Sequence, residues 1–275
     1  MDNQQSVITL NDGNVIPQLG LGVWKATQDE ARDAVATALR YGYRHVDTAA
    51  VYENEEGVGA GVRASGIPRD DVFVTTKIWN AEQGLKPAGR ALDESLQRLK
   101  LDHVDLLLIH WPAPELGLFV ETWQALIKAR AQGKVRSIGV SNFNEDHLQT
   151  LINETGVTPV LNQIELHPYF QQTHLRAVHQ KLTVRSQSWS PLSQGAAVND
   201  PQIIELAGKY GRSPAQVILR WHLQSGLIAI PKSVTPARIE ENFHVFDFNL
   251  DAADMAVIDG VDKHTRLGPD PLVFA

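Results

Sequence analysis

Residues 72–111, VFVTTKIWNAEQGLKPAGRALDESLQRLKLDHVDLLLIHW, contain two short apolar runs separated by a helical pattern. The runs are VFVTTKIW (72–79) and VDLLLIHW (104–111). Between them, PAGRALDESLQRLK has Pro87 near its first helical position and basic residues at its end, as helices prefer. A strand, a helix and a second strand in this order predict a βαβ unit of a parallel sheet.

The same alternation continues on both sides of this unit. The other strand candidates are LGVW (21–24), YRHVDTA (43–49), VRSIGVSN (135–142), PVLNQIEL (159–166), TVRSQSW (183–189) and LIAIPKSV (227–234). Helical patterns include DEARDAVATALRYG with Gly42 as its cap, FVETWQALIKARAQG ending at Gly133, and SPAQVILRWHLQSG capped by Ser213. Eight strands with intervening helices predict a closed (β/α)8 barrel, a TIM barrel, forming one domain over residues 1–275. The alternative is an open doubly wound sheet, which the count of eight disfavours.

Two segments lie outside the repeat. VITLNDGNVIPQLG alternates around Asp12 and Gly13, which predicts an N-terminal β-hairpin able to plug the bottom of the barrel. DAADMAVIDGV (251–261) predicts an extra C-terminal helix before the tail.

The composition excludes several classes of protein. The 275 residues are 43% hydrophobic and 21% charged, with net charge −7 and no cysteine. We therefore expect no disulfide, no thiolate metal site and no nucleic-acid partner. The N-terminus lacks the features of a signal peptide and no apolar run is long enough to span a membrane, so we expect a cytoplasmic protein.

Polar side chains and tryptophans occupy the predicted C-terminal ends of the strands, the rim at which barrel enzymes carry their sites. They are Trp24, Asp47 with Tyr52, Lys77 with Trp79, His110 with Trp111, Ser141 with Asn142, Gln163, Trp189, and Lys232 with Ser233. Each has a structural alternative: Asp47 as a turn residue, His110 as a core histidine, and Trp79 as core packing. Their convergence on one rim favours a shared site.

The chemistry of four of these residues suits protonation of a carbonyl oxygen. The ordinary pKa of tyrosine is about 10, and a neighbouring Lys77 ammonium, held by Asp47, is expected to lower the pKa of Tyr52. His110 is expected to orient the carbonyl oxygen or share its proton. The acids after Tyr52, namely Glu53, Glu55 and Glu56, are interpreted as helix N-terminal charges.

A cofactor hydride is the expected reductant because the chain has no cysteine and no G-x-S-x-G elbow. The Rossmann fingerprint fails, since GVGAGV (57–62) has Val62 at its third glycine position. Lys232, Ser233 and Arg238 instead suit a phosphomonoester at the start of a helix, with surface charge as the alternative. A nicotinamide could bind through Ser141, Asn142 and Gln163 and stack on Trp189.

Three stretches carry a family resemblance: GYRHVDTAAVYENEEGVG, GKVRSIGVSNFNEDHL and IPKSVTPARIEENFHVFDF. Through them the whole chain resembles the aldo-keto reductases, and within them the branch of bacterial 2,5-diketo-D-gluconate reductases, which also reduce methylglyoxal and β-keto esters. The resemblance implies direct hydride transfer from NADPH without a metal, in a monomer. It implies a catalytic tetrad of Asp47, Tyr52, Lys77 and His110, with Tyr52 as proton donor.

The resemblance also implies ligand contacts. The cofactor contacts are Ser141, Asn142, Gln163, Trp189, Leu192, Gln194, Lys232, Ser233, Val234, Arg238, Glu241 and Asn242, and the substrate contacts are Trp24, Trp79, His110 and Trp111. Short segments after His110 and after residue 262 predict an open pocket for small polar carbonyls.

Two other functions remain open on these residues. One is a non-catalytic barrel subunit that binds NADPH, which the complete tetrad disfavours. The other is a metal-dependent barrel hydrolase or isomerase, which the absence of an HExxH pair among ten histidines disfavours.

Overall fold

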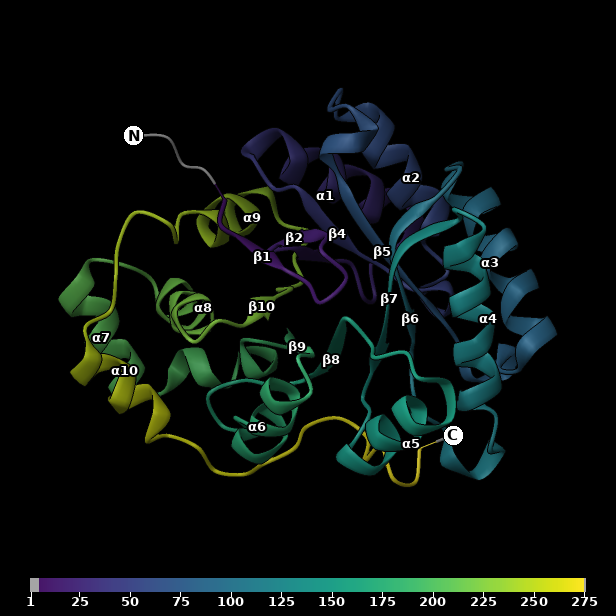
Figure 1. The fold of residues 1–275 in the computed structure, drawn as a ribbon. Coiled ribbons are helices and arrows are strands. Elements are labelled where there is room, and N and C mark those ends of the chain that lie inside the picture. Colours follow the sequence, from purple (N-terminus) through teal and green to yellow (C-terminus); the bar gives the residue numbers. More distant parts are fainter. Residues whose placement is uncertain (1–4, 275) are drawn as a thin grey trace.

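The computed structural model describes residues 5–274 and shows strands and helices alternating along the chain (Figure 1). Eight strands form one parallel sheet: β3 (Leu21–Gly22), β4 (His45–Asp47), β5 (Phe73–Ile78), β6 (Val104–Ile109), β7 (Val135–Ser141), β8 (Leu161–Glu165), β9 (Arg185–Trp189) and β10 (Ile228–Ala229). Each of the eight predicted strands is confirmed, in most cases shortened at its ends.

Helices follow the strands and cover the outside of the sheet. They are α1 (Gln28–Tyr41), α2 (Glu55–Ala64), α3 (Leu85–Leu99), α4 (Phe119–Ala131), α5 (Glu145–Thr155), α6 (Thr173–Lys181), α7 (Pro201–Tyr210), α8 (Pro214–Gln224), α9 (Pro236–Phe243) and α10 (Ala252–Asp259). The last of these is the predicted extra helix.

Local sequence explains the helix ends, with two corrections. Gly42 caps α1 with φ 117°, a left-handed conformation that suits glycine, and Ser213 caps α8 as predicted. However, α3 begins at Leu85, so Pro87, which was expected near the first helical position, is the third residue of the helix. Helix α4 ends at Ala131 and is capped by Gln132, one residue before Gly133.

The sheet closes on itself between its first and last strands. The Gly20 N–H donates to Ala229 O (2.8 Å) and the Gly22 N–H to Pro231 O (3.1 Å). A Cβ at Gly22 would lie only 3.0 Å from Ile230 O, so glycine permits this close approach. The barrel prediction is therefore confirmed, and the open doubly wound alternative is wrong.

The predicted hairpin consists of β1 (Val7–Thr9) and β2 (Val15–Pro17), paired antiparallel. Its turn contacts the N-terminal ends of two barrel strands: Asn11 Nδ2 donates to Pro159 O (3.0 Å) and Ser137 Oγ to Asp12 Oδ2 (2.7 Å). The hairpin therefore plugs the end of the barrel opposite to the C-terminal ends of the strands.

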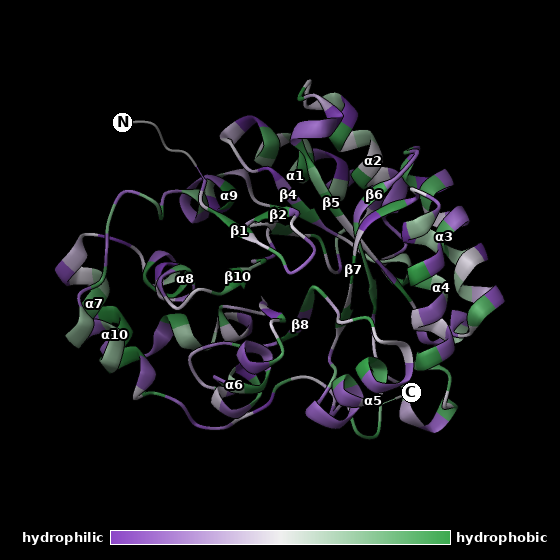
Figure 2. Cartoon of the chain, viewed as in Figure 1, coloured by the Kyte–Doolittle hydropathy of each residue, from purple (hydrophilic) through white to green (hydrophobic). Residues whose placement is uncertain are grey.

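The apolar core lies in the barrel wall and between the strands and the helices. In Figure 2 the ribbon of β5 is mostly hydrophobic, whereas α3 and α4 alternate between hydrophobic and hydrophilic residues. All residues of β5 and β6 are buried. Among residues 5–274, no helix combines the length and hydropathy needed to cross a membrane.

Candidate active site

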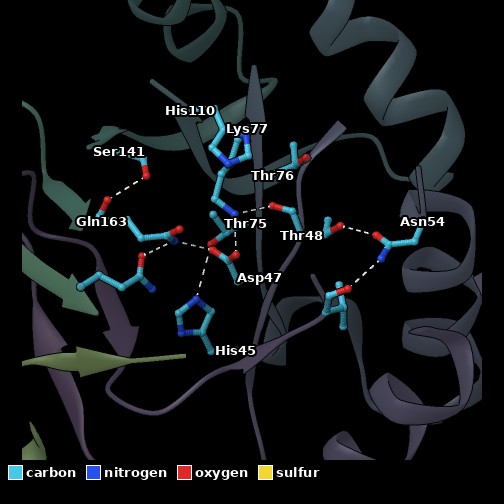
Figure 3. Close-up of polar contacts among 12 residues, drawn as sticks. His45, Asp47, Thr48, Asn54, Thr75, Thr76, Lys77, His110, Ser141 and Gln163 are labelled. Carbon is cyan, nitrogen blue, oxygen red and sulfur yellow. Dashed lines mark hydrogen bonds and ion pairs between the residues drawn. The ribbon is translucent and has the colours of Figure 1, made fainter. Parts of the chain in front are cut away.

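Asp47 and Lys77 form a buried ion pair at the C-terminal ends of β4 and β5 (Figure 3). Lys77 Nζ lies 2.5 Å from Asp47 Oδ1 and also donates to Thr48 O at 2.8 Å. Both side chains are in effect fully removed from solvent, where an unpaired charge would be very unfavourable. The pairing inferred from the sequence is therefore present.

Tyr52 is brought back to this pair by a short 3-10 turn, η1 (Ala50–Tyr52). Lys77 Nζ lies 5.1 Å from the centroid of the Tyr52 ring, and that ring lies 5.7 Å from the ring of His110. His110 follows β6 directly, as predicted. The structure therefore brings together the four residues of the predicted tetrad.

Asn54 fixes the turn that carries Tyr52, and sequence reasoning did not select it. It is fully buried, and its Nδ2 donates to Val23 O (2.9 Å) and Ala26 O (3.0 Å), while its Oδ1 accepts from Thr48 Oγ1 (2.7 Å). These bonds tie the segment after Tyr52 to the loops after β3 and β4. A polar residue directly after a strand-end turn was the available signal.

The interpretation of the acidic run as helix N-terminal charges is confirmed for Glu55 and Glu56, which lie in the first turn of α2, and is wrong for Glu53, which ends the preceding 3-10 turn. Glu55 is also buried, accepts from Thr76 Oγ1 (2.5 Å) and pairs with Arg98 Nε (2.7 Å). It therefore supports β5 in addition to its place at the helix N-terminus.

The electrostatics of Tyr52 differ from the expected direction. Burial raises the pKa of Tyr52 and Asp47 adds to this, while the Lys77 ammonium lowers it, with the net result above the ordinary value. The expected lowering is therefore wrong as a net effect, because desolvation of the phenolate exceeds the attraction of the ammonium. Burial by itself lowers the pKa of Lys77, but Asp47 and Tyr52 more than offset it and leave it raised.

His110 is held neutral. Burial, with Lys77 as a second cause, places the pKa of its imidazole well below the ordinary value. Its Nδ1 is buried without a hydrogen-bond partner in the described part of the chain. A neutral imidazole can orient a ligand oxygen through a hydrogen bond but does not act as a strong acid at neutral pH.

Gln163 links Asp47 to the neighbouring strands. Its Nε2 donates to Asp47 Oδ2 (2.7 Å) and to Gln187 Oε1 (2.9 Å), which uses both amide hydrogens within the protein (Figure 3). The side-chain oxygen of Gln163, Oε1, is then the atom available to accept from a carboxamide N–H. Gln187, on β9, was missed by sequence reasoning, although it is a polar residue within a barrel strand.

Ser141, Asn142 and Trp189 form a connected group beside Gln163. Ser141 Oγ donates to Gln163 O (2.7 Å), Asn142 Nδ2 donates to His110 O (3.0 Å), and Trp189 Nε1 donates to Asn142 Oδ1 (2.8 Å). Asn142 has φ 62°, a left-handed conformation that asparagine tolerates. Because these donors are already used, a carboxamide oxygen could bind here only by exchange of one of these bonds.

These groups border a cavity of about 520 Å³ at the C-terminal end of the barrel. All four predicted substrate residues line it: Trp24, Trp79, His110 and Trp111. The structure adds three residues of the C-terminal tail that were not predicted: Gly268, Pro269 and Phe274. The pocket is therefore less open on that side than the short tail suggested.

A second cavity, of about 650 Å³, adjoins the first, and both are lined by Trp24, Lys25, Ser190, Gln194 and Lys232. Of the predicted cofactor residues, those lining this groove are Leu192, Gln194, Lys232, Ser233, Arg238, Glu241 and Asn242. Val234 lines neither cavity. The groove reaches the start of α9, where the cations Lys232 and Arg238 suit a phosphate.

No group of three or more His, Asp or Glu side chains within residues 5–274 is arranged to hold a metal ion.

Comparisons with known proteins agree with this geometry. The family model described as "Aldo/keto reductase family" matches residues 18–263. Methylglyoxal reductase DkgA of Salmonella typhimurium is 53% identical over 271 residues, with 98% of each chain covered.

Solved structures agree as well. The aldo/keto reductase structure from Brucella melitensis is 55% identical, has a TM-score of 0.93, and covers 95% of this chain and 100% of its own. A mutant of Gox0644 in complex with NADPH is 50% identical, has a TM-score of 0.95, and covers 98% of this chain and 99% of its own. The chain therefore belongs to the aldo/keto reductase family.

Proposed function

We propose that this protein reduces small aldehydes and ketones to alcohols with NADPH, and that Tyr52 donates the proton. The observation that carries the proposal is the buried Asp47–Lys77 pair beside Tyr52, at a cavity that continues into a groove with two cations. As a member of the aldo/keto reductase family, the chain is an NADP-dependent oxidoreductase that reduces carbonyl groups.

The groove offers the groups that NADPH requires. Lys232, Ser233 and Arg238 would hold the 2′-phosphate, with Glu241 and Asn242 toward the adenine and Leu192 and Gln194 along the groove. Ser141, Asn142 and Gln163 would hold the carboxamide, and Trp189 would stack on the ring. The uncommitted Gln163 oxygen and the hydrogen-bonded position of the Trp189 indole support this placement.

When bound, the reduced nicotinamide supplies the hydride that adds to the carbonyl carbon. Tyr52 gives its proton to the carbonyl oxygen, so the product is a neutral alcohol. The Lys77 ammonium, kept charged by Asp47, stabilises the tyrosinate that remains until solvent returns the proton. The neutral imidazole of His110 orients the carbonyl oxygen toward Tyr52.

The proposed substrates are methylglyoxal, 2,5-diketo-D-gluconate and β-keto esters. Support comes from the methylglyoxal reductase relatives and from a cavity whose lining combines aromatic side chains with polar groups. Such a surface suits small carbonyl compounds with further polar atoms. We also propose that the protein acts as a cytoplasmic monomer of one domain, for which sedimentation of the purified chain tests the oligomeric state.

The Tyr52→Phe variant tests the mechanism. Removing the hydroxyl is expected to lower kcat/KM for methylglyoxal by about 10²-fold or more, because the transition state loses its proton donor. The Kd for NADPH, measured by fluorescence titration, is expected to change less than about threefold, because the hydroxyl acts on the substrate.

Two outcomes would point elsewhere. Full activity of Tyr52→Phe would overturn the proposed acid. A wild-type protein that binds NADPH but reduces no member of a broad carbonyl panel would instead indicate the non-catalytic subunit.

A further inference from the structure

Glu165, the last residue of β8, is a buried carboxylate that the proposed chemistry does not use. Its Oε1 accepts from His167 Nε2 (2.9 Å) and from the Leu267 N–H (2.6 Å), and its Oε2 accepts from the Gly268 N–H (2.8 Å). In residues 5–274 no Lys or Arg lies within ion-pair distance of it. Two of its partners are therefore adjacent residues of the C-terminal tail, here defined as residues 262–274.

These contacts favour the charged form of the carboxylate. Burial alone raises the pKa of Glu165, but the hydrogen bonds from His167, Leu267 and Gly268 outweigh it, so the pKa lies below its ordinary value. A carboxylate that accepts backbone N–H groups in a buried place forms strong, charge-assisted bonds. Glu165 is thus suited to hold backbone that has no regular secondary structure of its own.

The first residues of the tail are bound to the loop between β8 and α6. Tyr169 O accepts from the N–H groups of Lys263 (3.1 Å) and Thr265 (3.0 Å). The guanidinium of Arg266 lies 4.7 Å from the centroid of the Phe170 ring. Figure 1 shows this segment running from α10 past α6 toward α5. The loop after β8 therefore guides the tail up to the point where Glu165 binds it.

The end of the tail reaches the carbonyl cavity. The Phe274 ring lies 4.5 Å from that of Trp111 and 6.2 Å from that of Trp79, measured between centroids. Pro269 and Gly268 also line the cavity. Gly268 is itself held by Glu165, and Pro269 and Phe274 follow it in the chain, so the bond to Glu165 constrains where these residues lie.

Gly268 connects the carboxylate to the stacking tryptophan. A Cβ at Gly268 would lie 2.5 Å from Trp189 Cη2 and 3.0 Å from Glu165 Oε2. Only a residue without a side chain permits the tail backbone to lie between the carboxylate and the edge of the indole.

We propose that Glu165 is a positioning residue that holds the C-terminal tail over the cavity, and that it thereby sets which carbonyl compounds the enzyme accepts. The inference rests on the proposed reductase function for its kinetic consequence, but not for the attachment of the tail. Glu165 is argued to act through Gly268, Pro269 and Phe274 and to touch neither substrate nor cofactor.

The first experiment measures the attachment without using activity. In Glu165→Gln the amide keeps the volume, but its NH2 group faces one backbone N–H and leaves that donor unpaired. We expect chymotrypsin to remove the residues after Leu267 about tenfold faster, as followed by mass spectrometry. The matched control is Glu154→Gln on the exposed face of α5, expected to match the wild type.

The second experiment measures substrate range. With Glu165→Gln we expect KM for 4-nitrobenzaldehyde, whose ring would contact Phe274, to rise about tenfold, while KM for methylglyoxal changes less than about threefold. We expect kcat for both substrates to stay within about threefold. Phe274→Ala should reproduce the difference in KM, and Gly268→Ala should reproduce it by displacing the tail from Trp189.

The outcomes separate the two proposals. Unchanged proteolysis and unchanged KM in Glu165→Gln would overturn the inference, as would an equal loss of kcat for both substrates, which indicates a merely structural role. If Glu165→Gln does not fold, Gly268→Ala and Phe274→Ala decide in the same way. If the wild type reduces no carbonyl compound, the reductase proposal fails, and the proteolysis result still decides whether Glu165 holds the tail.

Discussion

At the residue scale, the protonation states at the site are set by burial as much as by charge. The pKa of Tyr52 is raised by burial despite Lys77, and the pKa of His110 is lowered by burial together with Lys77. Both effects favour the neutral form of each group, which for tyrosine is also the form that can donate a proton.

These directions predict a flat pH dependence for reduction. Because the pKa of Tyr52 lies above its ordinary value, Tyr52 keeps its proton at neutral and moderately alkaline pH, and His110, whose pKa is lowered, stays neutral through the range where histidine ordinarily titrates. We therefore expect kcat/KM with saturating NADPH to vary less than about threefold between about pH 6.5 and 9 and to fall only at higher pH. An acidic limb centred near pH 6.5 would show that His110 titrates normally and contradict this account.

The phosphate clamp is the second feature at this scale. Lys232 and Arg238 are exposed on the groove and lie on either side of the start of α9. In Arg238→Ala we expect the Kd for NADPH to rise about 10- to 100-fold, the effect of losing a charged hydrogen bond. The Kd for NADH, which lacks the 2′-phosphate, should change less than about threefold. Arg90→Ala, exposed on α3, is the control, and equal losses for both cofactors would exclude the clamp.

At the scale of elements, the structure explains the glycines of α2 that resemble a nucleotide-binding motif. A Cβ at Gly57 would meet Gln28 O, and one at Gly61 would lie 2.6 Å from Arg32 O, so both face α1. A Cβ at Gly59 would meet the backbone of Leu99 at the end of α3. The glycines therefore serve close helix packing and have no role in binding phosphate.

This packing predicts opposite effects for two glycine substitutions. Gly59→Ala is expected to lower the free energy of unfolding by about 1–3 kcal/mol or more, because backbone cannot move aside as a flexible side chain can. Gly89→Ala, within α3 and with nothing within 4 Å of its added Cβ, is expected to raise it by about 0.5–1 kcal/mol. Urea denaturation measures both, and a neutral Gly59→Ala would contradict the packing assigned to α2.

The strands and helices could be predicted from the sequence because their apolar residues recur in a regular pattern. Segments without such a pattern could not be predicted. The eight strands were found because apolar runs alternate with helices, and the strand-end residues Asp47, Lys77 and His110 followed from the geometry of a parallel barrel. Asn54, Gln187 and the tail residues were missed because their roles depend on bonds between distant segments. The sequence showed that a charged lysine would lie near Tyr52, but it could not show how strongly Tyr52 is shielded from solvent. That burial decides whether the pKa of Tyr52 is raised or lowered.

At the scale of the whole molecule, the barrel separates its two ends. The site lies at the C-terminal ends of the strands. The plug lies at the opposite end, where Ile16 joins a separate apolar cluster with Phe73, Leu106 and Leu161. No residue of the plug lines either of the two cavities described above. Stability supplied by the plug and stability supplied by bound NADPH should therefore be independent.

The Ile16→Ala variant tests this separation. Ile16 is fully buried, and its truncation is expected to lower the free energy of unfolding by about 2–5 kcal/mol, whereas Val15→Ala on the exposed face of the same strand should cost less than about 1 kcal/mol. NADPH at about 100 times its Kd adds about 2.7 kcal/mol to any protein that binds it only when folded. We expect denaturation with and without NADPH to give this same increment in the wild type and in both variants. A smaller increment in Ile16→Ala would mean that the plug shapes the cofactor groove through the barrel, because only a weaker Kd can reduce it at fixed NADPH concentration.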